Sequence, residues 1–325
     1  MEMYRAVDMH CDTVSSLWRR GREGKPGSLR ESDLSVDLHK MRQGNYLLQN
    51  FAMFVLLGRD GDPLVHVLEL MDEYERQMAA NRDWIAPVYR YADIEKNQAE
   101  GKLSALLTVE EGGVTKGNVA VLRNLYRLGV RMMTLTWNFE NELGYPHTIR
   151  ELPDYDPGKP YGLKEQGIAM VEEMDRLGMI VDVSHLSDGG FWDVIRYGKR
   201  PFVASHSNAR SVQNHSRNLT DEMIRALADR GGVMGINFCD SFLASQGPGT
   251  VEDMIRHIRH IRNVGGIGCI GLGTDFDGID NTPEIGHAGQ MPLLARGLEQ
   301  AGFKPAEIDA IYSGNVLRVY QEVLQ

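Results

Sequence analysis

The sequence predicts an α/β fold, a single (β/α)8 (TIM) barrel over residues 1–325 with loop insertions at the C-terminal ends of its strands. Short apolar runs rich in β-branched residues alternate with stretches of helical spacing, which favours parallel βαβ units. Several runs, such as SALLTV and GGVMGINF, are apolar at nearly every position, as in strands covered on both faces. An open doubly wound sheet would need a glycine-rich dinucleotide turn after an early strand, and the sequence has none.

The predicted elements follow one another along the chain. Strands are expected at residues 5–11, 46–57, 103–109, 130–136, 179–184, 201–205, 232–238 and 267–274. Apolar residues with helical spacing predict helices around residues 64–71, 121–128, 170–177 and 254–261. Proline and glycine gather at residues 138–163, after the fourth strand, and a second such region at 241–250 follows the seventh. Both are expected to be long loops.

Composition and charge exclude several classes of protein. Lys and Arg number 35 against 45 Asp and Glu, a net charge of −10, so nothing in the sequence suits a phosphate backbone or an anionic membrane. No apolar run reaches the 18 or so residues of a membrane span, and the N-terminus MEMYRAVDMHCD is unlike a secretory signal. Three cysteines without a CxxC pair argue against a disulfide framework. We therefore expect a cytoplasmic enzyme or binding protein.

Five of the eight predicted strands end in His, Asp or Glu, within VDMHCD, LLTVEEGG, IVDVSH, FVASH and IGLGTDFDG. Active residues of such barrels lie at these strand ends. His10 and Asp12 are two apart, so an extended chain projects both side chains to one side, and both suit an ion such as zinc. The alternative is a core histidine and an aspartate that caps the following loop.

The other strand ends add candidates of the same kind. Glu110 and Glu111 follow an apolar strand, where a carboxylate can cap a helix or bridge two cations. His185 and His206 each end a strand, and a lone histidine there is more often a hydrogen-bonded polar group than a ligand. Two on neighbouring strands, with carboxylates on the others, instead favour a metal site.

Asp275, in GTDFDG, is expected to be a general acid or base that faces the metals. A calcium loop is excluded, because Ile279 and Asp280 stand where that loop needs an oxygen ligand and a glycine. Arg217 lies in a loop, where it can fork onto a substrate carboxylate, and nearby His215 is a candidate substrate contact. The remaining histidines are interpreted as helical surface or packing residues (His39, His66, His257, His260) or as loop residues of open role (His147, His287).

The sequence resembles the membrane (renal) dipeptidase family of zinc metallopeptidases, whose barrel is of the amidohydrolase-like, metal-dependent hydrolase type. The likeness runs along nearly the whole chain. Beyond the strand ends already quoted, it includes LYRLGVRMMTLT, ASHSNARSVQNHSRN, GVMGINF and GNVLRVY. Their order and spacing together make the resemblance specific.

The resemblance implies a metallodipeptidase with two divalent ions, usually zinc, although the same ligands suit manganese or cobalt. By that likeness one ion is held by His10, Asp12 and Glu110, and the other by Glu110, His185 and His206. Glu111 remains an alternative to Glu110. The likeness also makes Arg217 the partner of the substrate's terminal carboxylate and Asp275 the catalytic aspartate. It further implies a dipeptide substrate, including ones with a C-terminal D-residue, and a homodimer.

One position departs from the renal type, which has a histidine after LT in the fourth strand. Here Trp137 stands in its place and Asn138 follows, and both are expected to contact substrate. Tryptophan can donate one N–H but cannot carry a proton. Two other functions therefore stay open: a two-metal barrel hydrolase of lactones, esters or cyclic amides, and an inactive metal-dependent binding protein. The first commonly has HxH at its start and a bridging lysine, and the expected strand ends carry neither.

Overall fold

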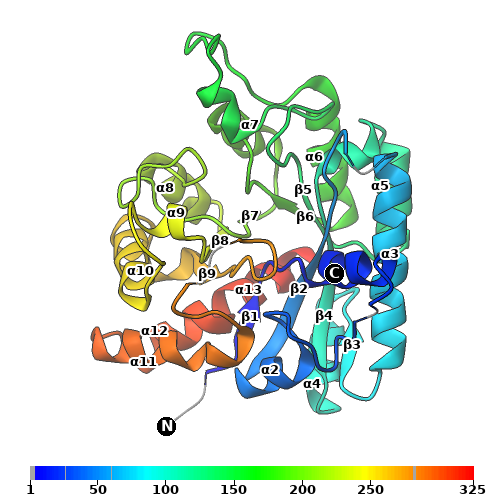
Figure 1. Cartoon of the computed structure of the whole chain (residues 1–325). Helices are drawn as coiled ribbons and strands as arrows, with labels where there is room; N and C mark the ends of the chain where they lie inside the picture. The colour runs from blue at the N-terminus through cyan, green and yellow to red at the C-terminus, as the bar shows by residue number, and fades with distance from the viewer. Residues whose placement is uncertain (1–3, 26, 60, 281–282) are drawn as a thin grey trace.

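Eight parallel strands close a barrel that is surrounded by helices (Figure 1). The computed structural model describes residues 4–25, 27–59, 61–280 and 283–325. Pairing of β2 with β4 completes the ring, so its order is β1, β2, β4, β5, β6, β7, β8, β9 and back to β1. The barrel strands are β1 (Ala6–Asp8), β2 (Tyr46–Phe54), β4 (Leu103–Glu110), β5 (Met132–Thr134), β6 (Ile180–Asp182), β7 (Val203–Ala204), β8 (Val233–Ile236) and β9 (Ile270–Leu272).

Each of the eight predicted runs coincides with one barrel strand, and only β4 extends beyond its run, by one residue, so the predicted (β/α)8 barrel is confirmed. Most strands are shorter than their runs, because pairing stops before the apolar residues do. A ninth strand, β3 (Ile85–Pro87), was not predicted. It pairs with Leu103–Ala105 at the start of β4, outside the ring, and its three residues include a proline, which gives little sequence signal.

Helices connect the strands and cover the outside of the barrel. They are α1 (Thr13–Arg22), α2 (Leu38–Gln43), α3 (Pro63–Ala80), α4 (Tyr91–Ala99), α5 (Val119–Arg127), α6 (Glu165–Leu177), α7 (Asp188–Tyr197), α8 (Asp221–Asp229), α9 (Asp240–Leu243), α10 (Val251–Gly265), α11 (Pro292–Gln300), α12 (Pro305–Asp309) and α13 (Asn315–Val323). The four predicted helices correspond to α3, α5, α6 and α10. Local signals set their starts: Asp62 caps α3 with Pro63 in its first turn, and Thr250 forms a capping box with Asp253 at α10.

Two features of the fold position the strand ends. The loop at 138–163 is irregular apart from a 3-10 helix, His147–Glu151, and the region after β8 contains the short α9 followed by irregular chain. At Gly273, directly after β9, a Cβ atom would lie 1.8 Å from the carbonyl oxygen of Ser205. Only glycine permits this approach, which brings the end of β9 against the residue that precedes His206.

Candidate metal centre and active site

The C-terminal ends of four strands bring five ligand-type side chains together. His10 and Asp12 follow β1, Glu110 is the last residue of β4, and His185 and His206 follow β6 and β7. Their ligand atoms form two groups, each with its atoms within 4.8 Å of one another: His10, Asp12 and Glu110, and Glu110, His185 and His206. A third group of the same kind contains His10, His206 and Asp275. All of these residues are buried.

Glu110 lies between the two groups. Its Oε2 is 3.2 Å from His10 Nε2, while its Oε1 is 3.1 Å from His185 Nε2 and 3.7 Å from His206 Nε2. The neighbouring Glu111 turns the other way: its carboxylate accepts from the backbone N–H groups of Gly113 and Trp137, at 2.7 and 3.0 Å. The structure therefore brings Glu110, and not Glu111, to the cluster, while Glu111 orders the loops beside it.

The unpartnered atoms of this cluster suit a cation. Three buried atoms have no hydrogen-bond partner among the described residues. They are the two ring nitrogens of His10 and Oδ1 of Asp12. Asp12 Oδ2 and Glu110 Oε2 lie 3.3 and 3.2 Å from His10 Nε2 without hydrogen-bond geometry. Buried polar atoms are costly without a partner. Several such atoms converging on one volume are what a metal ion would satisfy.

The three histidines of the cluster differ in charge, because the carboxylates of Glu110 and Asp12 outweigh burial and raise the pKa of His10 well above its usual value, whereas burial dominates at His185 and His206. Burial lowers the pKa of His185 and of His206 well below the usual value, so both rings are neutral, as a metal ligand must be. Burial also raises the pKa of Glu110 to about 7, against the opposing pull of His10. Divalent ions beside this carboxylate would lower its pKa again and keep it ionised.

Neighbouring side chains orient the two neutral histidines. His206 Nδ1 lies 2.7 Å from Ser205 Oγ, and Ser205 in turn donates its hydroxyl to Asp182. His185 Nδ1 lies 2.8 Å from Asn138 Oδ1, an atom that can only accept. Both Nδ1 atoms therefore carry the proton, and both Nε2 lone pairs point into the cluster, 3.0 Å apart. Outer partners of this kind fix the tautomer of metal-binding histidines.

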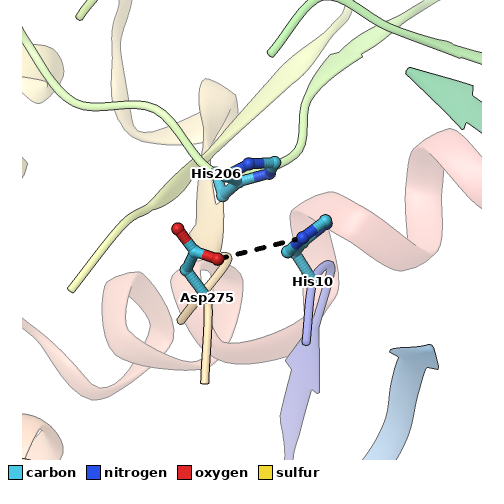
Figure 2. A group of neighbouring side chains, drawn as sticks. All are labelled: His10, His206 and Asp275. Atoms are coloured by element: carbon cyan, nitrogen blue, oxygen red, sulfur yellow. Dashed lines mark ion pairs between the residues drawn. The ribbon is translucent and has the colours of Figure 1, made fainter. Parts of the chain in front are cut away.

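Asp275 faces the same volume from the end of β9. Its Oδ1 is 3.9 Å from His10 Nε2, and Figure 2 shows the two side chains facing each other beside the ring of His206. Its Oδ2 accepts from Asn237 Nδ2 at 2.9 Å, which holds the carboxylate in place. Burial raises the pKa of Asp275, so this carboxyl takes up a proton more readily than an exposed aspartate.

A pocket of about 580 Å³ opens above the cluster, a volume that suits a small ligand. Asp12, Glu110, His185 and Asp275 line its floor. One wall is aromatic, where Trp137 lies edge-on to Phe54 with ring centroids 5.0 Å apart. Asn138 also lines the pocket, so both residues expected to contact substrate face it. The remaining lining residues are mainly polar: Ser15, Ser16, Arg19, Cys239, Asp240, Ser241, Phe242, Asp277, Gly278, Ile279 and Asp280.

Arg217 lies beside the pocket rather than in the part of its lining that the structure describes. Its guanidinium is buried, donates from Nη1 to Ser207 Oγ at 2.7 Å and lies 5.9 Å from the ring centroid of Phe242. Its Nε and Nη2 have no hydrogen-bond partner among the described residues. Burial lowers the pKa of Arg217 to about 10, so it stays charged at neutral pH. His215 accepts from the Arg217 backbone N–H and so shapes this loop.

Sequence reasoning missed the residues that support the cluster. Asp182 accepts from Ser205, Ser184 and Thr134, and so links the ends of β5, β6 and β7. Asp8 accepts from both the N–H and the hydroxyl of Thr274 and links β1 to β9. Each is a charged residue inside an apolar run, two or three positions before a candidate histidine. A charged residue at such a position in an apolar run is a signal by which both supporting residues could have been predicted.

Comparisons with known proteins identify the family of the chain. The model of the membrane dipeptidase family, peptidase family M19, matches residues 1–325. The chain belongs to this family. An uncharacterised dipeptidase of Schizosaccharomyces pombe is 33% identical over 304 residues, which are 88% of this chain and 72% of that protein.

Solved structures give the same assignment. A dipeptidase of family M19 superposes with a TM-score of 0.88 at 25% identity over 99% of both chains. A metallopeptidase from Rhodobacter sphaeroides, solved with a phosphinate mimic of L-Ala-D-Ala, has the same fold, with a TM-score of 0.87, 24% identity and 99% and 100% of the two chains covered.

Membership of the M19 family makes the protein a metal-dependent dipeptidase, with divalent metal ions as cofactor and a peptide as substrate. The candidate metal-binding groups of the barrel mouth agree with this assignment. In the part of the chain that the structure describes, no helix has both the length and the apolar character that a membrane crossing requires.

Proposed function

We propose that this M19 dipeptidase cleaves dipeptides with two divalent ions, most simply zinc, at the mouth of its barrel. One ion would be held by His10, Asp12 and Glu110, and the other by Glu110, His185 and His206. The observation that carries the proposal is the place of Glu110, whose two oxygens face separate groups of histidines at 3.1–3.7 Å. A carboxylate in that position can bridge two cations.

The ions would supply an activated water near neutral pH and polarise the scissile carbonyl. Asp275 then moves the proton. Its Oδ2 is held by Asn237, so Oδ1 is free to accept a proton from the attacking water and to return it to the leaving amine nitrogen. The peptide C–N bond breaks as a C–O bond forms, and the water's protons end on the carboxyl and amine products.

Arg217 would bind the terminal carboxylate of the substrate. A guanidinium with two unpartnered N–H groups can make paired hydrogen bonds to a carboxylate, and this one is buried beside the pocket. A fixed cation beside the pocket favours short substrates, because a longer peptide places its terminal carboxylate elsewhere. Trp137 and Asn138, which line the pocket, would also contact the substrate.

The test is metal analysis of the purified protein together with a panel of dipeptides. We expect about two divalent ions per chain, loss of turnover with a chelator, and release of free amino acids. L-Ala-D-Ala belongs in the panel because a mimic of it occupies the R. sphaeroides structure, and its hydrolysis would support acceptance of a C-terminal D-residue. Turnover of lactones or esters without peptides, or tight binding without turnover, would overturn the proposal.

Three further predictions from the sequence accompany this proposal. They are the single-domain organisation over residues 1–325, the homodimer and the cytoplasmic location. Sedimentation and fractionation of the producing cells would test the last two.

A further inference from the structure

The loop after β5 is bound to the backbone of a candidate ligand, His185. The His147 N–H donates to the His185 carbonyl at 2.8 Å, and the Ser187 N–H donates to the Tyr145 carbonyl at 2.9 Å. Pro146 forms an antiparallel bridge to Leu186 between them. His185 has φ +67°, a left-handed conformation that costs a non-glycine residue free energy. Pairing with the loop therefore helps to hold His185 in a conformation that it would not adopt alone.

The side chains of the loop also reach the His185 ring. Asn138 Oδ1 lies 2.8 Å from His185 Nδ1 and 2.9 Å from His147 Nε2. An amide oxygen can only accept, so both ring nitrogens that face it must carry hydrogen. The N–H of His147 thus stabilises the amide orientation that keeps the proton on His185 Nδ1 and leaves Nε2 available to a metal.

The far side of the His147 ring is fixed as well. Its Nδ1 lies 2.8 Å from Ser216 Oγ, in the loop that follows β7. The Ser216 hydroxyl has two acceptors within reach, His147 Nδ1 and Glu151 Oε1 at 2.9 Å, and it donates to Nδ1 when Nε2 carries the hydrogen that Asn138 Oδ1 accepts. His147 is 5% exposed and is not among the described residues that line the pocket, so we place it outside direct contact with substrate.

We propose that His147 is a positioning residue, which acts through Asn138 to hold His185 in the tautomer and orientation needed to bind a metal ion. The inference rests on the proposed function, because it assumes that His185 is a ligand. The loop at 138–163 would then have two roles. Asn138 lines the pocket, and together with His147 it sets the affinity of His185 for its metal ion.

Two variants of similar shape test the contacts of the two ring nitrogens of His147 separately. His147→Gln places an amide near the position of Nε2 and can still donate to Asn138, whereas His147→Asn reaches only toward Ser216. We expect His147→Asn and His147→Ala to weaken binding of one of the two ions by about 10–100-fold, and His147→Gln to restore most of that affinity. His39→Ala, which removes an exposed histidine of α2, is the control and should bind both ions normally.

The readouts are metal affinity by chelator competition and the visible absorption spectrum of the cobalt-loaded protein. The spectrum should change in His147→Asn and stay close to wild type in His147→Gln. Equal metal affinities and spectra for the Gln and Asn variants would overturn the inference, even if His147→Ala failed to fold. A wild-type protein that binds no ions would instead refute the proposed function.

Discussion

The two ends of the barrel are built from the same strands and have opposite chemistry. At the N-terminal end, the interior is filled by apolar side chains of seven strands, among them Val7, Leu48, Leu106, Ile180 and Val233. Helix α13 closes this end with Val316, Val319, Tyr320 and Val323. The Tyr320 hydroxyl of this helix bonds to the side chain of Asn50 at 2.7–3.0 Å.

At the C-terminal end, buried polar atoms lack partners and the backbone is strained. Four of the seven described non-glycine residues with positive φ lie within five residues after a barrel strand: Glu111, His185, Asp275 and Asp277. Such conformations cost about 1–3 kcal/mol each and persist only where the surrounding structure holds them. The comparison teaches that the closed end stabilises the fold, while the open end uses part of that stability to hold side chains for chemistry.

The largest effect on activity should come from a substitution at the open, C-terminal end of the barrel. Asp275→Asn should lower kcat by about 10²–10⁴-fold, because the amide cannot accept the proton. It should retain the metal ions and the thermal stability, since it adds no volume. Steady-state kinetics and metal content measure both, with Asp229→Asn, on the exposed end of α8, as the control. A near wild-type rate would remove Asp275 from the mechanism.

A substitution at the closed end should lower the stability of the protein and leave its kcat unchanged. Leu106 is fully buried in β4, so Leu106→Ala should destabilise the protein by about 2–5 kcal/mol through lost contacts and a cavity. The kcat at a permissive temperature and the metal content should stay unchanged. Urea unfolding gives the free energy, and Leu128→Ala, at 52% exposure, should change it by less than about 0.5 kcal/mol. An altered metal content would show that the two ends are coupled.

A pH-dependent effect is expected at His257, which joins loops of the open end. Its Nδ1 accepts from the Ala209 N–H and its Nε2 donates to the Leu243 carbonyl. Burial lowers its pKa from 6.5 to about 4, so between these values the unfolded chain binds more protons than the folded chain. Stability should therefore fall by up to about 3 kcal/mol as the pH drops from 6.5 to 4.

His257→Gln cannot titrate, so its stability should fall less over the same pH range. Unfolding measured from pH 7 to pH 4 gives the difference between the two proteins, which removes the contribution of the carboxylates. Parallel curves would show that His257 does not carry this dependence.

The smallest effect concerns substrate binding. Arg217→Ala should raise KM for a dipeptide by roughly 10–100-fold, the value of one or two hydrogen bonds to a charged group, and change kcat less. A dipeptide with an amidated C-terminus should show little difference between wild type and variant. An unchanged KM for the free-carboxylate dipeptide would mean that Arg217 binds no carboxylate.

The sequence predicted the barrel well because each barrel strand is marked by an apolar run and four of the helices by their spacing. It also predicted the convergence of His10, Glu110, His185 and His206, because the ends of parallel strands meet at one edge of a barrel. It favoured Glu110 but left Glu111 open as an alternative. Every residue of β4 is buried, so alternation of polar and apolar residues, which would give the phase of the strand, is missing.

The supporting residues were harder to predict, because their partners come from other strands and loops. His147 is one histidine in a loop rich in proline and glycine, and only the fold brings it to Asn138 and Ser216. Likewise, β3 pairs with β4 through three residues that carry no pattern of their own. Sequence patterns specify elements, whereas contacts between distant irregular segments depend on the completed fold.

The ring closure has a consequence for synthesis of the chain. Asp8 of β1 pairs with Leu272 of β9, and α13, which fills the N-terminal end of the barrel, follows β9 in the chain. While the chain is being made, β1 can pair with β2 but has one edge open until nearly all of the protein has left the ribosome. Unpaired strand edges promote aggregation. The cell must therefore keep this nascent chain from associating with its neighbours for most of the translation time.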